Sequence, residues 1–394
     1  MTFRAALLLG LTLLPPAAHA QRTPQELAAA LQRTARAGDA PAYRALLAPE
    51  GTFAVEGANF AADLARRVPR DVTFTFSDLR GEGARAAATL TLAWTRVPEG
   101  QTGSRAGGQP NRVSLPVQLV RVGEVWRYAG EAFLAVSPSP VPADPAPAQT
   151  GTAQTGTAQT GTLLALAVPG LPERVAPLAG LLPRAAREVR AVLGLDVPGN
   201  AVVKVYPDAE RLSASVALSL QPVSGWNEPG EAIKLALPGG APAQAEASAL
   251  RVLTHEFTHL AVGVAAQRAG GPQGDKRIPW WLHEGLANFA ARAFTAGASW
   301  QSGQARANAY ARAGWVPLSE LADFPAVPEN RWDHAYRQGL GVVEFLAGKQ
   351  GRDAPWRLAQ AFAQTGDRDR AARALGFASF AALEREARAW LAAR

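Results

Sequence analysis

A proline-rich and repetitive segment divides this chain of 394 residues into two parts. From Ser137 to Thr162 the sequence reads SPSPVPADPAPAQTGTAQTGTAQTGT, with prolines first and then three copies of Ala-Gln-Thr-Gly-Thr. After Val141 it offers almost no large apolar side chains to a core, and the repeat is too short and too polar to stack into a solenoid. We therefore predict a flexible linker over residues 137–162, with a reach on the order of 30 Å, between two domains that need not touch.

The first twenty residues have the pattern of a secretory signal peptide. A positive charge at Arg4 precedes an apolar run from Ala5 to Leu14, and small residues end the segment at Ala20. The apolar run is far shorter than the roughly 20 residues that a membrane-spanning helix needs. We expect residues 1–20 to be removed, and the mature protein to be secreted or periplasmic with no membrane span.

The composition narrows the chemistry that is open to an exported chain. The sequence contains no cysteine, so disulfides, thiolate zinc ligands and cysteine nucleophiles are excluded, and metal binding would depend on His, Asp and Glu. The formal net charge is +7, but the arginines are scattered through alanine-rich segments. A nucleic-acid surface needs a basic stripe with interleaved aromatic residues, so we expect no nucleic acid partner.

Residues 21–136 have the pattern of an α+β domain. Two helical patterns come first, TPQELAAALQRTARAG and DAPAYRALLAP. Four segments follow in which apolar and polar residues alternate, as in β-strands: DVTFTFSDLRGE, ARAAATLTLAWTRV, NRVSLPVQLVRVG and EVWRYAGEAFLAV. This order resembles the cone-shaped nuclear-transport-factor-2-like fold, in which helices precede a curved antiparallel sheet. The segment has no histidine and no carboxylate pair spaced as an acid and a base, so we expect a non-catalytic accessory role.

Residues 163–394 have a mostly helical pattern with a few short strands. NAVVKVYPD and EAIKLALP are the predicted strands, and the second is stopped by Pro238. A long helical pattern runs from about Ala243 to Arg268. We expect EAIKLALP to be an edge strand along a cleft, where an extended peptide could add as a further strand.

The long helical pattern contains LTHEFTHLAV, which places two of the chain's five histidines one helical turn apart. On a helix, His255 and His259 leave the same face and can meet one metal ion at about 2.0–2.1 Å. Glu256 points about 100° around the helix, too far to bind the same ion comfortably, but well placed to act as a general base on an attacking water. A catalytic zinc site needs a third protein ligand.

The segment PWWLHEGLANFAARAF supplies a candidate for that ligand. It starts a helix with proline and carries Glu284 followed by Gly285, whose missing side chain would leave room where two helices and a metal crowd together. Two imidazoles and one carboxylate are a common ligand set of hydrolytic zinc sites. We expect His283 to point away from Glu284 into solvent, because adjacent helical positions do not share a face.

HEFTH followed by IPWWLHEGLANF resembles the gluzincin metallopeptidases, and most of all the peptidase MA-like group with its His-Glu-x-x-His and Trp-Leu-x-Glu-Gly helices. The resemblance covers roughly residues 163–394. It implies His255, His259 and Glu284 as ligands of Zn²⁺, Glu256 as the catalytic base, and a peptide or protein as the substrate.

A later segment, WDHAYRQGLGVVEFLAGKQG, is similar to the family's tyrosine-containing helix near the catalytic centre. It suggests Tyr336 as a hydrogen-bond donor to the oxyanion of the tetrahedral intermediate. A core tyrosine with a satisfied hydroxyl fits the same pattern equally well, and His334 is an alternative donor. Large aminopeptidases with a similar Glu-Gly helix carry a Gly-x-Met-Glu-Asn segment, whereas the only methionine here is Met1. Aminopeptidase specificity is therefore not supported, and we expect an endopeptidase or a peptidase of unknown end preference.

Three other interpretations compete with a zinc peptidase. A helix that spells the motif by chance would bury two imidazoles and a glutamate unpaired, at a cost of several kcal/mol. A catalytically inactive zinc-binding scaffold, whose amino-terminal domain binds a ligand or partner, would have no need of Glu256. A sugar hydrolase would need paired carboxylates at a set separation. If histidines hold zinc, they must be neutral, so we expect activity to fade below about pH 6.

Overall fold

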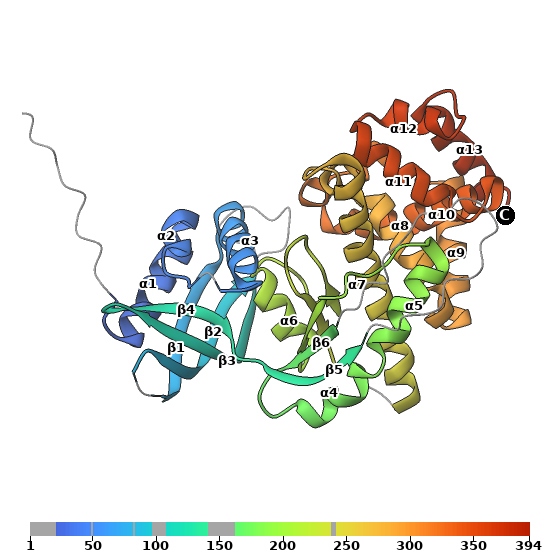
Figure 1. Ribbon diagram of the computed structural model, residues 1–394. Helices are drawn as coiled ribbons and strands as arrows, with labels where there is room; N and C mark the ends of the chain where they lie inside the picture. The colour runs from blue at the N-terminus through green and yellow to red at the C-terminus, as the bar shows by residue number, and fades with distance from the viewer. Residues whose placement is uncertain (1–20, 49, 82, 97–107, 141–161, 238–241) are drawn as a thin grey trace, which may run out of the picture.

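The structure is a computed structural model, which describes residues 21–48, 50–81, 83–96, 108–140, 162–237 and 242–394. It is of mixed α and β type, with a helix-and-sheet part at the amino terminus, a second sheet in the middle and a helical carboxy-terminal region (Figure 1). The predicted signal peptide (1–20) and the repeats of the predicted linker (within 141–161) lie outside the described residues.

Three helices precede the first sheet. α1 (Pro24–Ala37) begins with a capping box, in which the Thr23 hydroxyl accepts the backbone N–H of Glu26 and the Glu26 carboxylate accepts the backbone N–H of Thr23. α2 (Ala40–Arg44) follows where the second helical pattern was predicted. α3 (Phe53–Arg66) was not predicted; its N-terminus has no side-chain cap, so the sequence carries little signal for its start.

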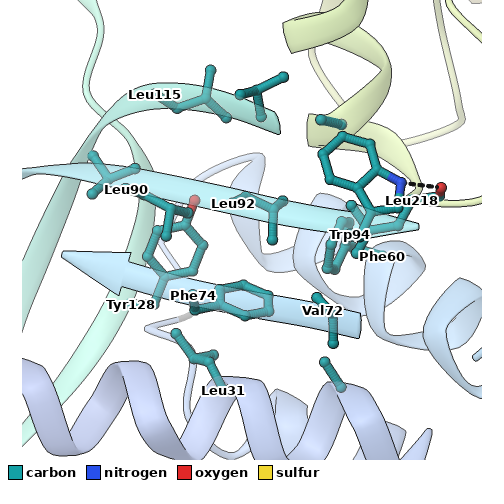
Figure 2. Close-up of a cluster of buried hydrophobic side chains, with 14 of the residues drawn as sticks. Leu31, Phe60, Val72, Phe74, Leu90, Leu92, Trp94, Leu115, Tyr128 and Leu218 are labelled. Atoms are coloured by element: carbon teal, nitrogen blue, oxygen red, sulfur yellow. Dashed lines mark hydrogen bonds between the residues drawn. The ribbon is translucent and has the colours of Figure 1, made fainter. Parts of the chain in front are cut away.

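The first sheet has four antiparallel strands in the order β1-β2-β3-β4. Their bounds are Arg70–Arg80, Arg85–Arg96, Gln109–Val122 and Val125–Glu131. Alternate residues such as Leu90, Leu92 and Trp94 face inward, and helices α1 and α3 cover that face (Figure 2). The first three strands lie within a few residues of the predicted segments, which fits the α+β order of this part. The fourth predicted segment, EVWRYAGEAFLAV, is divided: its first half forms β4, and residues 134–136 begin a strand of the second sheet.

The second sheet is mixed, in the order β5-β6-β7-β9-β8. The bounds of these strands, in chain order from β5 to β9, are Leu134–Pro140, Thr162–Ala167, Val202–Tyr206, Gly225–Trp226 and Ile233–Ala236. β6, β7 and β9 run parallel to one another, while β5 and β8 are antiparallel edge strands.

Two sequence predictions about this sheet are wrong. The linker was expected to begin at Ser137, but residues 137–140 continue strand β5, where an edge position tolerates their prolines. The strand in EAIKLALP was expected at the edge, but β9 is internal because the two-residue strand β8 pairs along its outer side. A strand as short as Gly225–Trp226 leaves no alternating pattern in the sequence.

Ten α-helices are described after β6, and short 3₁₀ turns lie between α7 and α10. Their bounds are α4 Pro172–Ala179, α5 Leu182–Leu193, α6 Ala209–Val216, α7 Pro242–Gly270, α8 Trp280–Ala290, α9 Gly297–Arg312, α10 Trp332–Gln350, α11 Ala354–Thr365, α12 Arg368–Ala374 and α13 Phe380–Ala392. None of the helices that the structure describes has the length and apolar character needed to cross a membrane.

The amino-terminal part and the second sheet region pack against each other, contrary to the expectation that they need not touch. Leu212 and Leu218 belong to the same buried cluster as Leu90 and Leu92 of the first sheet. The indole Nε1 of Trp94 donates a hydrogen bond of 2.8 Å to the carbonyl of Leu218 (Figure 2). The composition of residues 137–162 could not predict this packing, because the side chains that make the contact lie far from that segment in the sequence.

Candidate metal centre and active-site cleft

Helix α7 carries the histidine motif on the face that is turned away from the core. Leu253, Phe257 and Ala261 lie on its buried face and are almost fully inaccessible to solvent. His255 and His259 leave a different face, are only partly buried, and line a cleft. The packing of Leu253, Phe257 and Ala261 therefore fixes the direction in which the two imidazoles point.

Three side-chain ligand groups converge at this point of the cleft. The Nε2 atoms of His255 and His259 are 3.1 Å apart. Glu284 Oε2 lies 3.2 Å from His255 Nε2, and Glu284 Oε1 lies 3.6 Å from His259 Nε2. One ligand atom from each of the three residues lies within 4.8 Å of the others, so the group can hold a metal ion.

These separations fit a tetrahedral zinc site. Zinc bonds of about 2.0–2.1 Å place neighbouring ligand atoms of a tetrahedron roughly 3.3–3.4 Å apart. Glu284 Oε2 is buried and makes no well-formed hydrogen bond to any described residue, which is unfavourable for a carboxylate without a cation. The donor set and the orphaned oxygen both fit Zn²⁺, and the fourth tetrahedral position remains for water or substrate.

Glu284 is fixed in place by its own helix, α8, and by the packing of α8 against α10. The Trp280 indole Nε1 donates a 2.9 Å hydrogen bond to Glu284 Oε1, one helical turn away. Gly285 packs on the backbone of Gly339 in α10, and a Cβ at either glycine would collide with backbone carbonyls. The sequence prediction that Gly285 relieves crowding is correct for two helices, but its contacts are with α10 rather than with the metal ligands.

The electrostatic environment favours a neutral His259. Burial lowers the pKa of His259 to about 3, although the charge of Glu284 acts in the opposite direction. For His255, burial would lower the pKa, but the nearby Glu284 carboxylate outweighs burial and raises it. Burial would raise the pKa of Glu284, and the two histidines lower it instead. Glu284 is therefore an ionised carboxylate beside two imidazoles.

Glu256 lies in the same cleft without joining the ligand group. Burial raises its pKa to about 7; His255 opposes the rise and Glu284 adds to it. Gly225 of β8 passes directly over the carboxylate, and any side chain at that glycine would collide with it. The Glu256 side chain thus extends from α7 to the edge strand β8 and lines the cleft there.

Tyr336 also lines the cleft, whereas His334 does not. The Tyr336 ring packs edge-on against Trp280, with centroids 5.8 Å apart, and its hydroxyl makes no hydrogen bond within the described parts of the chain. Burial raises its pKa well above the ordinary value, and Glu284 and Glu256 add to the shift. His334 instead stacks on Tyr310 and lies 2.9 Å, Nδ1 to Oε1, from Gln338, so only Tyr336 faces the site.

The prediction that His283 lies in solvent is wrong. Its side chain is only 15% exposed, and its Nε2 is 3.3 Å from Asp275 Oδ1. The His283 ring lies 5.7 Å from that of His259, centroid to centroid. The helix geometry correctly separates His283 from Glu284, but Asp275, from the turn Asp275–Arg277, folds over it. Sequence reasoning missed Asp275, since no spacing rule links a turn to a helix it packs on.

The cleft is larger than a pocket for a small molecule. Its volume is about 1650 Å³, against ~300–1,000 Å³ for typical small-molecule sites. Most of the wall is formed by helices α7, α8 and α10, the first part of α9 with the residues before it, and residues 222–229 around β8. Val55 and Asn59, from α3 of the amino-terminal part, also line it. Asn59 donates a 2.7 Å hydrogen bond to Glu231, so the amino-terminal part supports one side of the cleft.

Two solved structures illustrate what this chain is similar to. No protein-family profile and no curated protein matches the chain. Among solved structures, a mutant of an M1 zinc metallopeptidase from Deinococcus radiodurans is similar, with 18% identity, a TM-score of 0.40, and coverage of 82% of this chain and 65% of that one. The unmutated enzyme gives 17% identity, a TM-score of 0.40, and coverage of 81% and 74%. The chain thus spans slightly less than two thirds of the first of these structures.

Proposed function

We propose that this protein is an exported zinc-dependent metallopeptidase that hydrolyses internal peptide bonds. The observation that carries the proposal is the convergence of His255, His259 and Glu284 at separations that fit a tetrahedral zinc ion. Glu256 lies beside them in the cleft, with a pKa of about 7. Export rests on the signal-peptide pattern of residues 1–20.

The proposed mechanism assigns one task to each residue. When bound, Zn²⁺ would lower the pKa of a water molecule and polarise the scissile carbonyl. His255, His259 and Glu284 hold the ion, and Trp280 holds Glu284. Glu256 takes a proton from the attacking water and passes it to the leaving amine, and a pKa near 7 suits both transfers at neutral pH.

Substrate binding would use the edge of the second sheet. β8 pairs with β9 on one side only, so its outer backbone groups are open to an added strand. A peptide in that position would pass over Glu256, which lies beneath Gly225. The Tyr336 hydroxyl, which has no hydrogen bond to the described chain, would donate to the oxyanion.

The test is cleavage of unfolded casein by zinc-loaded protein and by its Glu256→Gln variant. Glutamine keeps the shape of the side chain but cannot accept the proton, so we expect kcat/KM to fall by about 10²–10⁴-fold while the variant still binds one zinc ion. Equal cleavage by both proteins would rule out Glu256 as the base. Zinc binding without cleavage by the unmutated protein would favour the inactive scaffold.

A further inference from the structure

Arg251 is a cleft residue that the mechanism above does not use. It lies on α7 four residues before His255, so it leaves the same helical face one turn earlier. Its side chain is partly buried and lines the cleft. No hydrogen bond or ion pair joins it to any residue in the described ranges, which is unusual for a partly buried guanidinium.

A second arginine faces the same part of the cleft. Arg337 follows Tyr336 on α10 and lines the cleft with it. Its Nε lies 3.3 Å from Asp333 Oδ1, but the same carboxylate also accepts from Arg306 at 3.0 Å and from Tyr310 at 2.7 Å. Asp333 is therefore shared by two guanidinium groups and one hydroxyl, so it neutralises Arg337 only in part.

The pKa of Arg251 reflects its burial and the positive charge of Arg337 beside it. Burial lowers its pKa; the charge of Glu256 opposes that shift and the charge of Arg337 reinforces it. The guanidinium groups of Arg251 and Arg337 repel each other. Among the described residues, the carboxylate that favours a charged Arg251 is that of Glu256, the proposed base, and it forms no ion pair with Arg251. A bound anion would relieve the repulsion and satisfy the free donors.

The shape of a guanidinium selects the kind of anion. Its planar donors match a carboxylate through two parallel hydrogen bonds. Four residues of helix place the Cα of Arg251 about 6 Å from that of His255, and an extended peptide advances about 3.3 Å per residue. A group bound by Arg251 would thus belong to a residue one or two positions from the bond that is cut.

We propose that Arg251, with Arg337 beside it, binds a carboxylate of the peptide substrate near the scissile bond. The proposal rests on the proposed peptidase function and narrows its substrate class to peptides with an acidic group at that position. Two sources share this chemistry: the α-carboxylate of a peptide's C-terminus and the side chain of Asp or Glu. Arg251 then acts as a specificity residue, and its contact is with substrate rather than with the metal ligands.

The experiment compares full-length zinc-loaded protein with its Arg251→Gln and Arg251→Lys variants. Three fluorogenic peptides of matched length are used: one with a free C-terminus, one amidated, and one amidated with glutamate replacing glutamine. Arg268→Gln is the control, since Arg268 lies exposed on the same helix away from the cleft. We expect wild type to prefer one of the carboxylate peptides by about 10- to 100-fold, the worth of a charged hydrogen bond.

Arg251→Gln should abolish that preference through KM, Arg251→Lys should restore part of it, and Arg268→Gln should keep it. Preference for the free C-terminus identifies the α-carboxylate, and preference for the glutamate peptide identifies a side chain. Equal cleavage of all three peptides by wild type and Arg251→Gln overturns the inference and leaves the peptidase intact. A shift in the pH profile of kcat, with no dependence on the peptide's charge, also overturns it, because Arg251 would then only tune Glu256.

Binding of the same peptides to zinc-loaded Glu256→Gln protein, followed by calorimetry, separates this inference from the proposed function. If no peptide is cleaved by wild type, the proposed function fails, but tighter binding of a carboxylate peptide that is lost in the Glu256→Gln, Arg251→Gln double variant still supports the Arg251 site. Equal binding of all peptides contradicts it.

Discussion

The residues of the candidate metal centre depend on partners that lie outside the ligand set. Trp280 fixes Glu284, Gly225 leaves room for Glu256, and Asp275 holds His283 beside His259. The convergence of His255, His259 and Glu284 could be predicted from the sequence because a helix repeats every 3.6 residues and because the two motifs resemble a known pair. Asp275 and Arg251 could not be predicted in this way. Asp275 matters because tertiary packing places it against His283. Arg251 matters because packing leaves it in the cleft without an ion-pair partner among the described residues.

Removal of the indole donor tests how far zinc affinity depends on such a partner. In Trp280→Phe, Glu284 Oε1 loses its 2.9 Å hydrogen bond while the aromatic ring is largely kept. We expect zinc affinity to fall by about 10- to 100-fold, as for other partners of metal ligands, measured by competition with a chromogenic chelator. Trp315→Phe is the control, because the Trp315 indole bonds Glu384 outside the cleft; an equal loss in both variants would contradict a local effect.

At the scale of elements, the site depends on the close approach of α8 and α10. Gly285 and Gly339 face each other across this contact, and each would collide with backbone if it gained a Cβ. The sequence predicted both helices, but not which glycine of α10 meets α8. It also missed α3, which begins without a side-chain cap, and β8, which is two residues long. Very short strands, and helices that begin without a side-chain cap, give little signal in the sequence and are identified only from the folded structure.

Substitution of Gly339 by alanine should separate α8 from α10. Overpacking of this kind costs about 1–3 kcal/mol or more in the free energy of unfolding, and the displacement of α8 should also weaken zinc binding through Glu284. The control is Gly348→Ala on the same helix, where a Cβ meets nothing within 4 Å and should be neutral or stabilise by up to about 1 kcal/mol. Chemical denaturation and chelator competition measure the two effects. Unchanged stability in Gly339→Ala would contradict the contact.

At the scale of the whole molecule, buried charges join the amino-terminal part to the second sheet. Lys204 Nζ of β7 lies 2.5 Å from Glu56 Oε2 of α3, with both side chains less than 10% exposed. Lys234 of β9 pairs with Glu231 at 3.1 Å, and Glu56 also accepts the backbone N–H of Ala232. The linker composition predicted separable domains, but a buried network of this kind needs both parts to be folded together.

Glu56→Gln tests this junction through stability and pH. Burial alone would raise the pKa of Glu56, but Lys234 and Lys204 outweigh it, so the pKa lies below its ordinary value of 4.5. A carboxyl group of this kind contributes stability above its ordinary pKa and loses it as the pH falls through the folded-state value. At pH 7 the variant leaves Lys204 buried beside a neutral amide, and we expect a loss of about 3–5 kcal/mol.

The difference between wild type and Glu56→Gln should shrink as the pH falls below the ordinary carboxyl pKa of 4.5, because the unfolded wild-type chain then takes up a proton that the lysine-paired folded carboxyl resists. Burial raises the pKa of Glu131 and the charge of Glu56 adds to the rise, so Glu131 titrates differently in the two proteins and the comparison is made with Glu131→Gln in both. Denaturant unfolding at several pH values measures this. A difference that stays constant down to pH 3 would show that Glu56 stabilises by shape rather than by charge.

The central claim is that His255, His259 and Glu284 hold one catalytic zinc ion. The direct measurement is elemental analysis of the purified mature protein and of Glu284→Ala, each assayed in parallel for cleavage of unfolded casein. The account predicts one zinc per chain with cleavage in the first protein, and loss of both in the second, which keeps only two of the three ligands. Cleavage by a protein that contains no zinc, or full zinc content and activity in Glu284→Ala, would contradict it.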